Sequence, residues 1–107
     1  MSESYTKVAA LRDVAPGKMK CVTVRDQRVL LANVGGKIYA ADEMCTHEEA
    51  SLCLGSLKGE LLKCPLHGSR FDLRTGAVLD EPADVPLKVY PVKVDGQDIY
   101  VNLGAQP

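Results

Sequence analysis

Hydrophobic and polar residues alternate through much of the first forty positions, which is the pattern of half-buried β-strands. Two such runs cover 18–24 and 28–34, and a polar turn separates them. Gly35 and Gly36 then join the second run to a short hydrophobic run at 37–40. A glycine pair between two such runs is typical of a β-hairpin, so a hairpin is predicted here, with another strand before it.

The C-terminal third repeats this pattern. Alternation covers 87–94, Asp95-Gly96 marks a tight turn, and a second run follows at 98–103, which predicts another hairpin. Pro91 lies inside the first run, and because proline lacks a backbone N–H, that strand is predicted to be an edge strand or to be bulged. With a short strand expected within 8–14 and no convincing helical period, the pattern predicts an all-β sandwich or barrel.

The segment 43–75 differs from both flanks, because it alternates weakly and is rich in Cys, His, Gly and Leu. It is predicted to be an insertion carried by the β framework. It contains Cys45-Thr46-His47 and Cys64-Pro65-Leu66-His67, separated by positions 48–63, and these motifs use both histidines of the chain. Each motif offers a thiolate and an imidazole within one loop, so the pair predicts a metal centre held from two sides.

Composition excludes several classes of protein. The 107 residues predict one domain, and 13 Lys+Arg against 14 Asp+Glu, with no basic run, give no electrostatic basis for binding nucleic acid. No apolar run reaches the roughly 20 residues of a membrane helix, and the N-terminal residues lack the build of a secretion signal. A cytoplasmic protein without membrane contact is therefore expected.

Four cysteines are present, and in a cytoplasmic protein they are more often metal ligands or buried thiols than disulfides. Cys21 lies inside a predicted strand and is expected to be a buried structural thiol. Cys53 lies in the insertion but outside both motifs, so a structural or oxidisable thiol is expected there. A structural zinc site is the alternative for the two motifs, but zinc usually pairs cysteine with cysteine and histidine with histidine at short spacing.

The string C-T-H, followed after sixteen residues by C-P-L-H-G-S-x-F-D, resembles the Rieske iron–sulfur signature. The later D-x-x-T-G and the final strand pair also fit that family. Within it, the chain resembles the small stand-alone Rieske ferredoxins of bacterial aromatic-ring dioxygenase systems, over roughly 7–103. The resemblance implies a single domain, 1–107, with an antiparallel β-sandwich or barrel base at about 1–43 and 73–107. A small cluster-binding subdomain is inserted at about 44–72.

The resemblance also implies one Rieske-type [2Fe–2S] cluster, with Cys45 and Cys64 on one iron and His47 and His67 on the other. Two thiolates and two neutral imidazoles leave the oxidised cluster without net charge, so an electron is added more easily than to a four-thiolate cluster. The second nitrogen of each imidazole tolerates a position at the rim and gives an electron a short exit.

Other residues are expected to surround the cluster without binding it. Gly68 lets the backbone approach, and the Ser69 hydroxyl donates a hydrogen bond to sulfur. Pro86 belongs to a proline-containing loop, 82–86, which resembles the family's third loop over the cluster. Leucines are expected to exclude water, namely Leu52, Leu54 and Leu66. Four flanking charges either bias docking or belong to a solvated surface, namely Glu43, Glu48, Glu49 and Arg70.

High-potential Rieske proteins of respiratory complexes resemble this chain but carry an extra cysteine in each loop and a tyrosine after the motif serine. The matching positions here are Ala50, Leu66 and Phe71, so neither that bridge nor that hydroxyl is present. Fewer donors to sulfur stabilise the reduced cluster less, which implies a potential near the low end of the Rieske range, about −150 mV.

The two histidines are both used by the cluster, so none remains for the mononuclear iron of a ring-hydroxylating oxygenase. No glycine-rich nucleotide fingerprint is present. The chain is therefore expected to be a one-electron carrier and not an enzyme. It would take electrons from a ferredoxin reductase, a flavin- and NAD(P)H-dependent one, and pass them to a terminal oxygenase. The alternatives are a small Rieske subunit of a larger reductase, nitrite-reductase-like, and a redox-sensing binding module.

Overall fold

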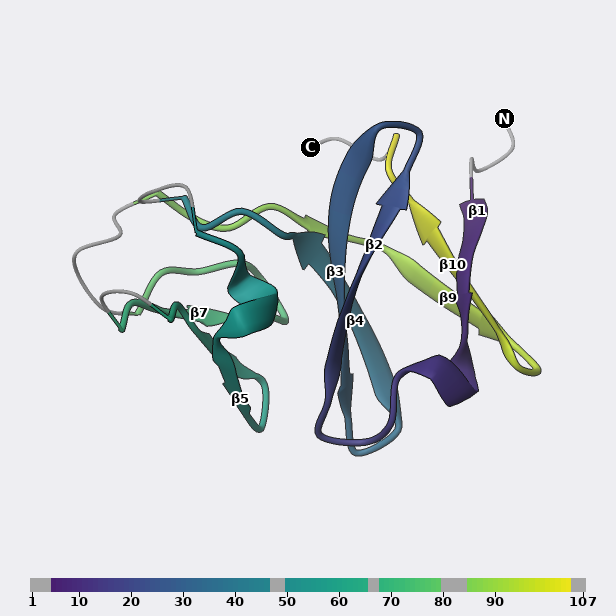
Figure 1. The fold of residues 1–107 in the computed structure, drawn as a ribbon, viewed down its shortest axis with the longest axis horizontal. Helices are drawn as coiled ribbons and strands as arrows, with labels where there is room; N and C mark the ends of the chain where they lie inside the picture. The colour runs from purple at the N-terminus through teal and green to yellow at the C-terminus, as the bar shows by residue number, and fades with distance from the viewer. Residues whose placement is uncertain (1–4, 47–49, 66–67, 80–84, 105–107) are drawn as a thin grey trace.

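The computed structural model describes residues 5–46, 50–65, 68–79 and 85–104. All paired strands in these ranges are antiparallel and form three sheets, arranged side by side in Figure 1. The only helices there are two short 3-10 turns, η1 (Leu11–Asp13) and η2 (Leu52–Leu54). The predicted all-β class is confirmed. No helix within the described ranges is long and apolar enough to cross a membrane.

The three sheets draw on separate parts of the chain. One has the order β1-β10-β9, formed by Tyr5–Ala10, Asp98–Asn102 and Val92–Asp95. The central sheet has the order β2-β3-β4-β8, formed by Met19–Val24, Gln27–Val34, Lys37–Asp42 and Val89–Tyr90. The third sheet has the order β5-β6-β7, formed by Ser56–Lys58, Leu61–Lys63 and Arg70–Asp72.

Strands β3 and β4 are buried on both faces. Because successive side chains of a strand point to opposite faces, Val29 and Leu31 enter the core shared with β10, while Leu30 and Ala32 enter a second core. That second core also contains residues of the third sheet, together with Cys45 and Cys64. The central sheet is therefore the middle layer, between the other two sheets (Figure 1).

Both predicted hairpins are confirmed. The first joins β3 to β4 through Gly35 and Gly36, which have positive φ angles of 60° and 101°. The second joins β9 to β10 through Asp95-Gly96. Pro91 divides the expected strand 87–94 into β8 and β9, which are edge strands of two different sheets. The edge position predicted for this proline is therefore confirmed, and the chain changes sheets at Pro91.

The insertion contains a sheet that the hydrophobic pattern does not reveal. Strands β5, β6 and β7 have three residues each, which is too short to show alternation. Gly76, in the turn that follows β7, connects to the segment that leads into β8, because the N–H of Leu87 donates to its carbonyl oxygen at 2.8 Å. Gly76 has a φ of +86°, and a Cβ there would collide with the Leu87 carbonyl oxygen, so only glycine fits this crossing.

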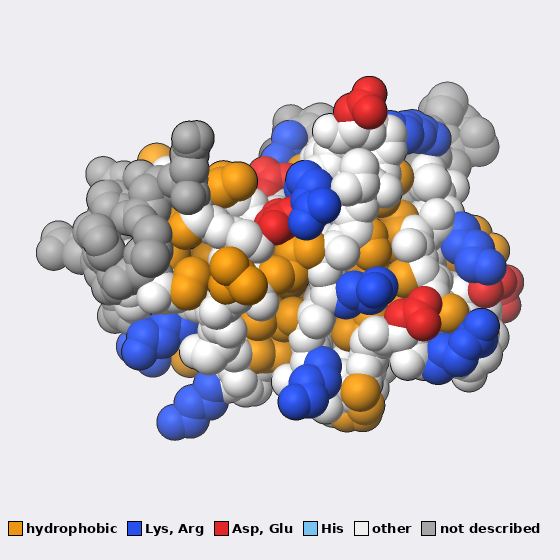
Figure 2. Space-filling view, in the orientation of Figure 1, with side chains coloured by type: hydrophobic (Ala, Val, Ile, Leu, Met, Phe, Trp, Pro, Cys, Tyr) orange, Lys and Arg blue, Asp and Glu red, His pale blue; other side chains and the backbone are white. Residues whose placement is uncertain are grey.

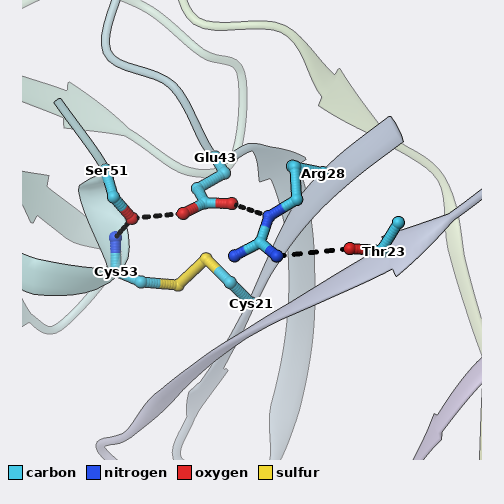
Figure 3. The surroundings of a disulfide bond; sticks show 6 residues. All are labelled: Cys21, Thr23, Arg28, Glu43, Ser51 and Cys53. Carbon is cyan, nitrogen blue, oxygen red and sulfur yellow. Dashed lines mark hydrogen bonds and ion pairs between the residues drawn. A yellow bond between two sulfur atoms is a disulfide. The ribbon is translucent and has the colours of Figure 1, made fainter. Parts of the chain in front are cut away.

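A disulfide joins Cys21 in β2 to Cys53 in η2, with their Cα atoms 6.1 Å apart (Figure 3). The expectation of a buried structural thiol at Cys21 is therefore wrong, and both residues are only half buried. The error came from treating the two cysteines separately. They lie 32 positions apart, and only the packing of the insertion against β2 brings them within bonding distance.

Candidate metal centre

Cys45 and Cys64 each open a short loop of the same construction. The N–H of Cys45 donates to the carbonyl oxygen of Ala50 at 2.9 Å, and the N–H of Cys64 donates to that of Ser69 at 2.8 Å. Each bond spans five positions, so each loop encloses four residues, one of which is a motif histidine in the sequence. The paired motifs of the sequence thus correspond to paired loops in the structure.

The two cysteines lie in one hydrophobic core. Cys45 is 4% exposed and Cys64 is 2% exposed, and neither is in a disulfide. Both belong to the second core, between the central and third sheets. His47, His67 and Leu66 lie outside the described residues, so half of the predicted ligand set is placed. Within the part of the chain that the structure describes, no three Cys, Asp, Glu or His residues converge.

The first loop is held by a buried carboxylate at the end of β4. Glu43 is only 7% exposed, and its side chain accepts hydrogen bonds from Arg28 Nε and Ser51 Oγ (Figure 3). Its backbone carbonyl accepts the N–H of Leu52 at 2.8 Å, which closes the base of the loop. The hydrogen bond from Arg28 lowers the pKa of the Glu43 carboxyl below its ordinary value. Glu43 is therefore a structural anchor, and its expected place among the flanking surface charges is wrong.

The second loop connects β6 to β7, where Lys63 pairs with Arg70. Gly68 has a φ of +78°, in the left-handed region that favours glycine. The backbone conformation alone therefore explains a glycine at this position, whether or not a cluster is bound nearby. Ser69 is fully buried, next to the loop's closing hydrogen bond. The roles of Gly68 and Ser69 toward a cluster remain predictions.

The first loop is also tied to the proline-containing segment. The Thr46 hydroxyl donates to the carbonyl oxygen of Val85 at 2.7 Å, next to Pro86. The expected third loop, 82–86, is described only at its last two residues, and both are exposed. This hydrogen bond places that end of the segment beside the first loop.

Side chains around the two cysteines only partly match the expectation. Leu52 is fully buried in their core, but Leu54 is 78% exposed, so its expected role in excluding water is wrong. The two leucines lie on one 3-10 turn, where residues two apart face different directions. Phe71 is completely buried in the same core, and Ala50 is buried as well. Neither side chain offers a hydroxyl or a thiol to this core.

Positive charge lies beside the second loop. Lys58, Lys63 and Arg70 line a hollow of about 440 Å³ on the third sheet, together with Ser56, Leu61 and Gly68. Lys63 pairs with Ser56 on β5 and with Arg70 on β7, which brings these side chains to one face. Figure 2 shows lysine and arginine side chains projecting at the end of the molecule where β5 lies.

A second polar network lies where β7 ends. Asp72 is buried, and Arg74 donates to both of its carboxylate oxygens, from Nε at 3.1 Å and from Nη2 at 2.8 Å. The Arg74 backbone N–H also donates to this carboxylate, at 2.9 Å. These hydrogen bonds lower the pKa of the Asp72 carboxyl. The D-x-x-T-G motif of the sequence includes Asp72, but nothing in the sequence indicated that Arg74 would pair with it.

Comparison with known proteins agrees with this fold and these loops. A family model described as the Rieske [2Fe-2S] domain matches residues 4–91. The chain therefore belongs to the Rieske [2Fe-2S] domain family. It is 40% identical over 103 residues to the ferredoxin component of the naphthalene 1,2-dioxygenase system of Pseudomonas aeruginosa, covering 96% of this chain and 99% of that protein.

Solved structures give the same result. The ferredoxin of carbazole 1,9a-dioxygenase from Nocardioides aromaticivorans IC177 superposes with a TM-score of 0.86 at 37% identity, covering 92% of this chain and 96% of that chain. A ferredoxin-sized chain in a complex of reduced oxygenase and oxidised ferredoxin in carbazole 1,9a-dioxygenase also has a TM-score of 0.86, at 36% identity and 94% coverage of both chains.

Replacing Asp72 by Asn is expected to reduce the acid sensitivity of the fold. The pKa of Asp72 is lower in the folded than in the unfolded protein, where it is about 3.9. The ionised carboxylate therefore stabilises the fold above that unfolded-state pKa, and this stabilisation is lost as the pH falls through the folded-state pKa. Urea midpoints measured between about pH 2 and pH 6 should therefore fall less steeply in Asp72→Asn than in the wild type. Asp95→Asn, at an exposed turn, is the matched control. Parallel curves for Asp72→Asn and the wild type would contradict this assignment.

Proposed function

We propose that this chain is a one-electron carrier that passes electrons from a reductase to a terminal aromatic-ring-hydroxylating oxygenase. The observation that carries the proposal is the pair of buried cysteine thiols, each opening a loop closed by the same backbone hydrogen bond. The similar proteins are ferredoxin components of dioxygenase systems, and a similar structure contains a ferredoxin in complex with an oxygenase. The chain is accordingly a ferredoxin component and not an enzyme.

The residues fit a Rieske cluster. Two buried thiols at equivalent loop positions suit one iron, and the imidazoles of His47 and His67, within the same loops in the sequence, suit the other. The cluster, when bound, supplies one-electron redox chemistry.

The proposed cluster-binding subdomain is 44–72, and the remainder of 1–107 is the base. The closed loops and the third sheet support this division.

The chain's own residues would then set the conditions for electron transfer. Leu52 and Phe71, both fully buried, exclude water from the core that contains the two cysteines. Lys58 and Lys63 place positive charge beside the second loop, which favours a reduced, more negative centre. Arg28 and Glu43 fix the first loop to the central sheet, so the position of Cys45 is set by the framework.

The partners are proposed at two levels of detail. The terminal oxygenase follows from the similar oxygenase–ferredoxin complex. The reductase is proposed to be a flavoprotein that uses NAD(P)H, because a two-electron nicotinamide donor needs a flavin to deliver single electrons. The chain is proposed to work in the cytoplasm.

An electron carrier needs access to both partners in turn, so each encounter with the reductase or the oxygenase is expected to be transient.

Metal analysis tests the ligand assignment. Purified protein is expected to contain about two irons and two acid-labile sulfides per chain, with the low-average-g EPR signal of a mixed Cys/His cluster after reduction. Variants His47→Ala, His67→Ala and Cys64→Ser should lose the cluster, whereas Ser56→Ala should retain it. Stoichiometric zinc in place of iron would refute the central proposal, and a normal cluster in either histidine variant would refute that ligand.

A reconstituted relay tests the function. The cluster-loaded protein should carry electrons from a flavin-dependent ferredoxin reductase to a Rieske oxygenase, measured as substrate-dependent NAD(P)H oxidation and hydroxylated product. It should form no product when the oxygenase is omitted, because the two histidines that the cluster uses are the only ones in the chain. The cluster-free Cys64→Ser protein is the control. Product formed by the isolated chain would overturn the carrier assignment.

Replacing Phe71 by Tyr is expected to raise the midpoint potential. The wild-type midpoint should lie near the low end of the Rieske range, about −150 mV, because Phe71 offers no hydroxyl to the cysteine core. A hydroxyl that donates to a cysteine sulfur stabilises the reduced form and shifts the midpoint upward in voltammetry. Phe71→Leu changes packing without adding a donor and should leave the midpoint nearly unchanged. Equal shifts in both variants would assign the effect to packing.

A further inference from the structure

Two of the four cysteines have no part in the proposed metal centre, and they form a covalent link from the central sheet to the insertion. Cys21 lies in β2, which is an edge strand because β3 is its only neighbour in the described sheet. Cys53 lies in η2, three residues beyond the end of the first loop, 45–50. The bond therefore ties the segment that follows this loop to β2.

We propose that Cys21–Cys53 is a second redox site, a two-electron dithiol–disulfide pair whose state controls how firmly the first loop is held. The part that concerns the cluster rests on the proposed function. The reductant is a dithiol, either a small molecule such as dithiothreitol or a protein of the thioredoxin class. The site is separate from the metal centre in residues and in the number of electrons it takes.

Accessibility supports a reactive bond over an inert one. Both cysteines are half buried, unlike Cys45 and Cys64, which are almost completely buried. The neighbouring Leu54 is largely exposed while Leu52 is buried, so one side of η2 lies at the surface. Attack by a thiolate needs access to a sulfur, and exposed disulfides are the ones that are commonly labile or regulatory.

The position of the bond gives it control over the loop. Figure 3 shows two links between the β2–β3 pair and the insertion: the disulfide itself, and the chain of contacts from Thr23 through Arg28 and Glu43 to Ser51. The two links meet, because the N–H of Cys53 donates to Ser51 Oγ at 3.3 Å. Opening the disulfide removes the covalent one of these two links, and the polar link that stays includes an arginine side chain that is more than half exposed.

The redox step balances without any component of the metal centre. A thiolate of the dithiol attacks one sulfur, the S–S bond breaks, and a mixed disulfide forms while the other cysteine leaves as a thiolate. The second thiolate of the reductant then releases the first cysteine. In total, two electrons and two protons pass from the dithiol to Cys21 and Cys53, and the reductant becomes a disulfide. A small-molecule disulfide, such as oxidised glutathione, reverses the exchange.

The first test follows the thiols of the folded wild-type protein. Dithiothreitol is added without denaturant, the thiols are alkylated, and peptides are mapped by mass spectrometry. Labelling of Cys21 and Cys53 is expected after reduction and not before it, and oxidised glutathione should abolish it. Labelling that requires unfolding would show an inert structural disulfide and overturn the proposal, and labelling without any reductant would show that no disulfide exists. These readouts hold whether or not a cluster is present.

The second test asks whether the bond controls the loop. In the wild type, dithiothreitol should lower the melting temperature by about 10 °C or more and speed the loss of the visible absorbance of the cluster to a chelator several-fold. The double variant Cys21→Ser/Cys53→Ser should show the faster loss without reductant and no further change with it, which controls for direct attack of dithiothreitol on the cluster. If wild type and variant lose the cluster at one rate, control of the loop is refuted. If no cluster is present in either, the proposed function fails, and the melting shift still tests the tether.

Discussion

Burial of the β3–β4 hairpin on both faces is the constraint on which the rest of this structure depends. Each strand sends alternate side chains into two cores, so the central sheet cannot face water on either side. The sheet β1-β10-β9 covers one face, and the insertion covers the other with leucines, Phe71, Cys45 and Cys64. The cysteine loops are therefore built onto a rigid sheet through a shared core. Such a core is well suited to fixing the positions of two loops that no continuous strand joins.

The loops gain their positions from links that differ in chemistry. Glu43 anchors the first loop through an ion pair between its buried carboxylate and the half-exposed Arg28, Thr46 connects the loop to Val85, and the second loop is fixed by the pairing of β6 with β7. Gly76 lets the third sheet approach the segment that leads into β8. Removing Arg28 would leave the buried Glu43 carboxylate without its main hydrogen-bond donor, so this anchor is costly to break from the arginine side. The framework thus restrains the two loops separately.

Local signals in the sequence predicted the elements that local chemistry determines. The glycine turns fixed both hairpins, and the missing N–H of Pro91 explained why a continuous hydrophobic run becomes two edge strands. Features that depend on tertiary packing were not predictable in the same way. The three-residue strands β5–β7 are too short for a period, and Glu43 is buried because Arg28 reaches it from another strand. The paired motifs predicted two loops of one kind, and the structure has them at Cys45 and Cys64. The binding of iron by these cysteines and by the two histidines stays a prediction.

The cysteines of this chain are divided by burial as well as by pairing. Cys45 and Cys64 lie within the second core, where water and thiols from solution are excluded, which suits residues proposed to hold metal. Cys21 and Cys53 are half buried at the margin of the same core, on an edge strand and a 3-10 turn, where we propose that thiol exchange reaches them. Both pairs pack against one core, and Cys53 follows the first loop by three residues, so the proposed switch would act on Cys45 through that loop. The four cysteines thus meet at one core, with the proposed metal ligands inside it and the disulfide at its margin.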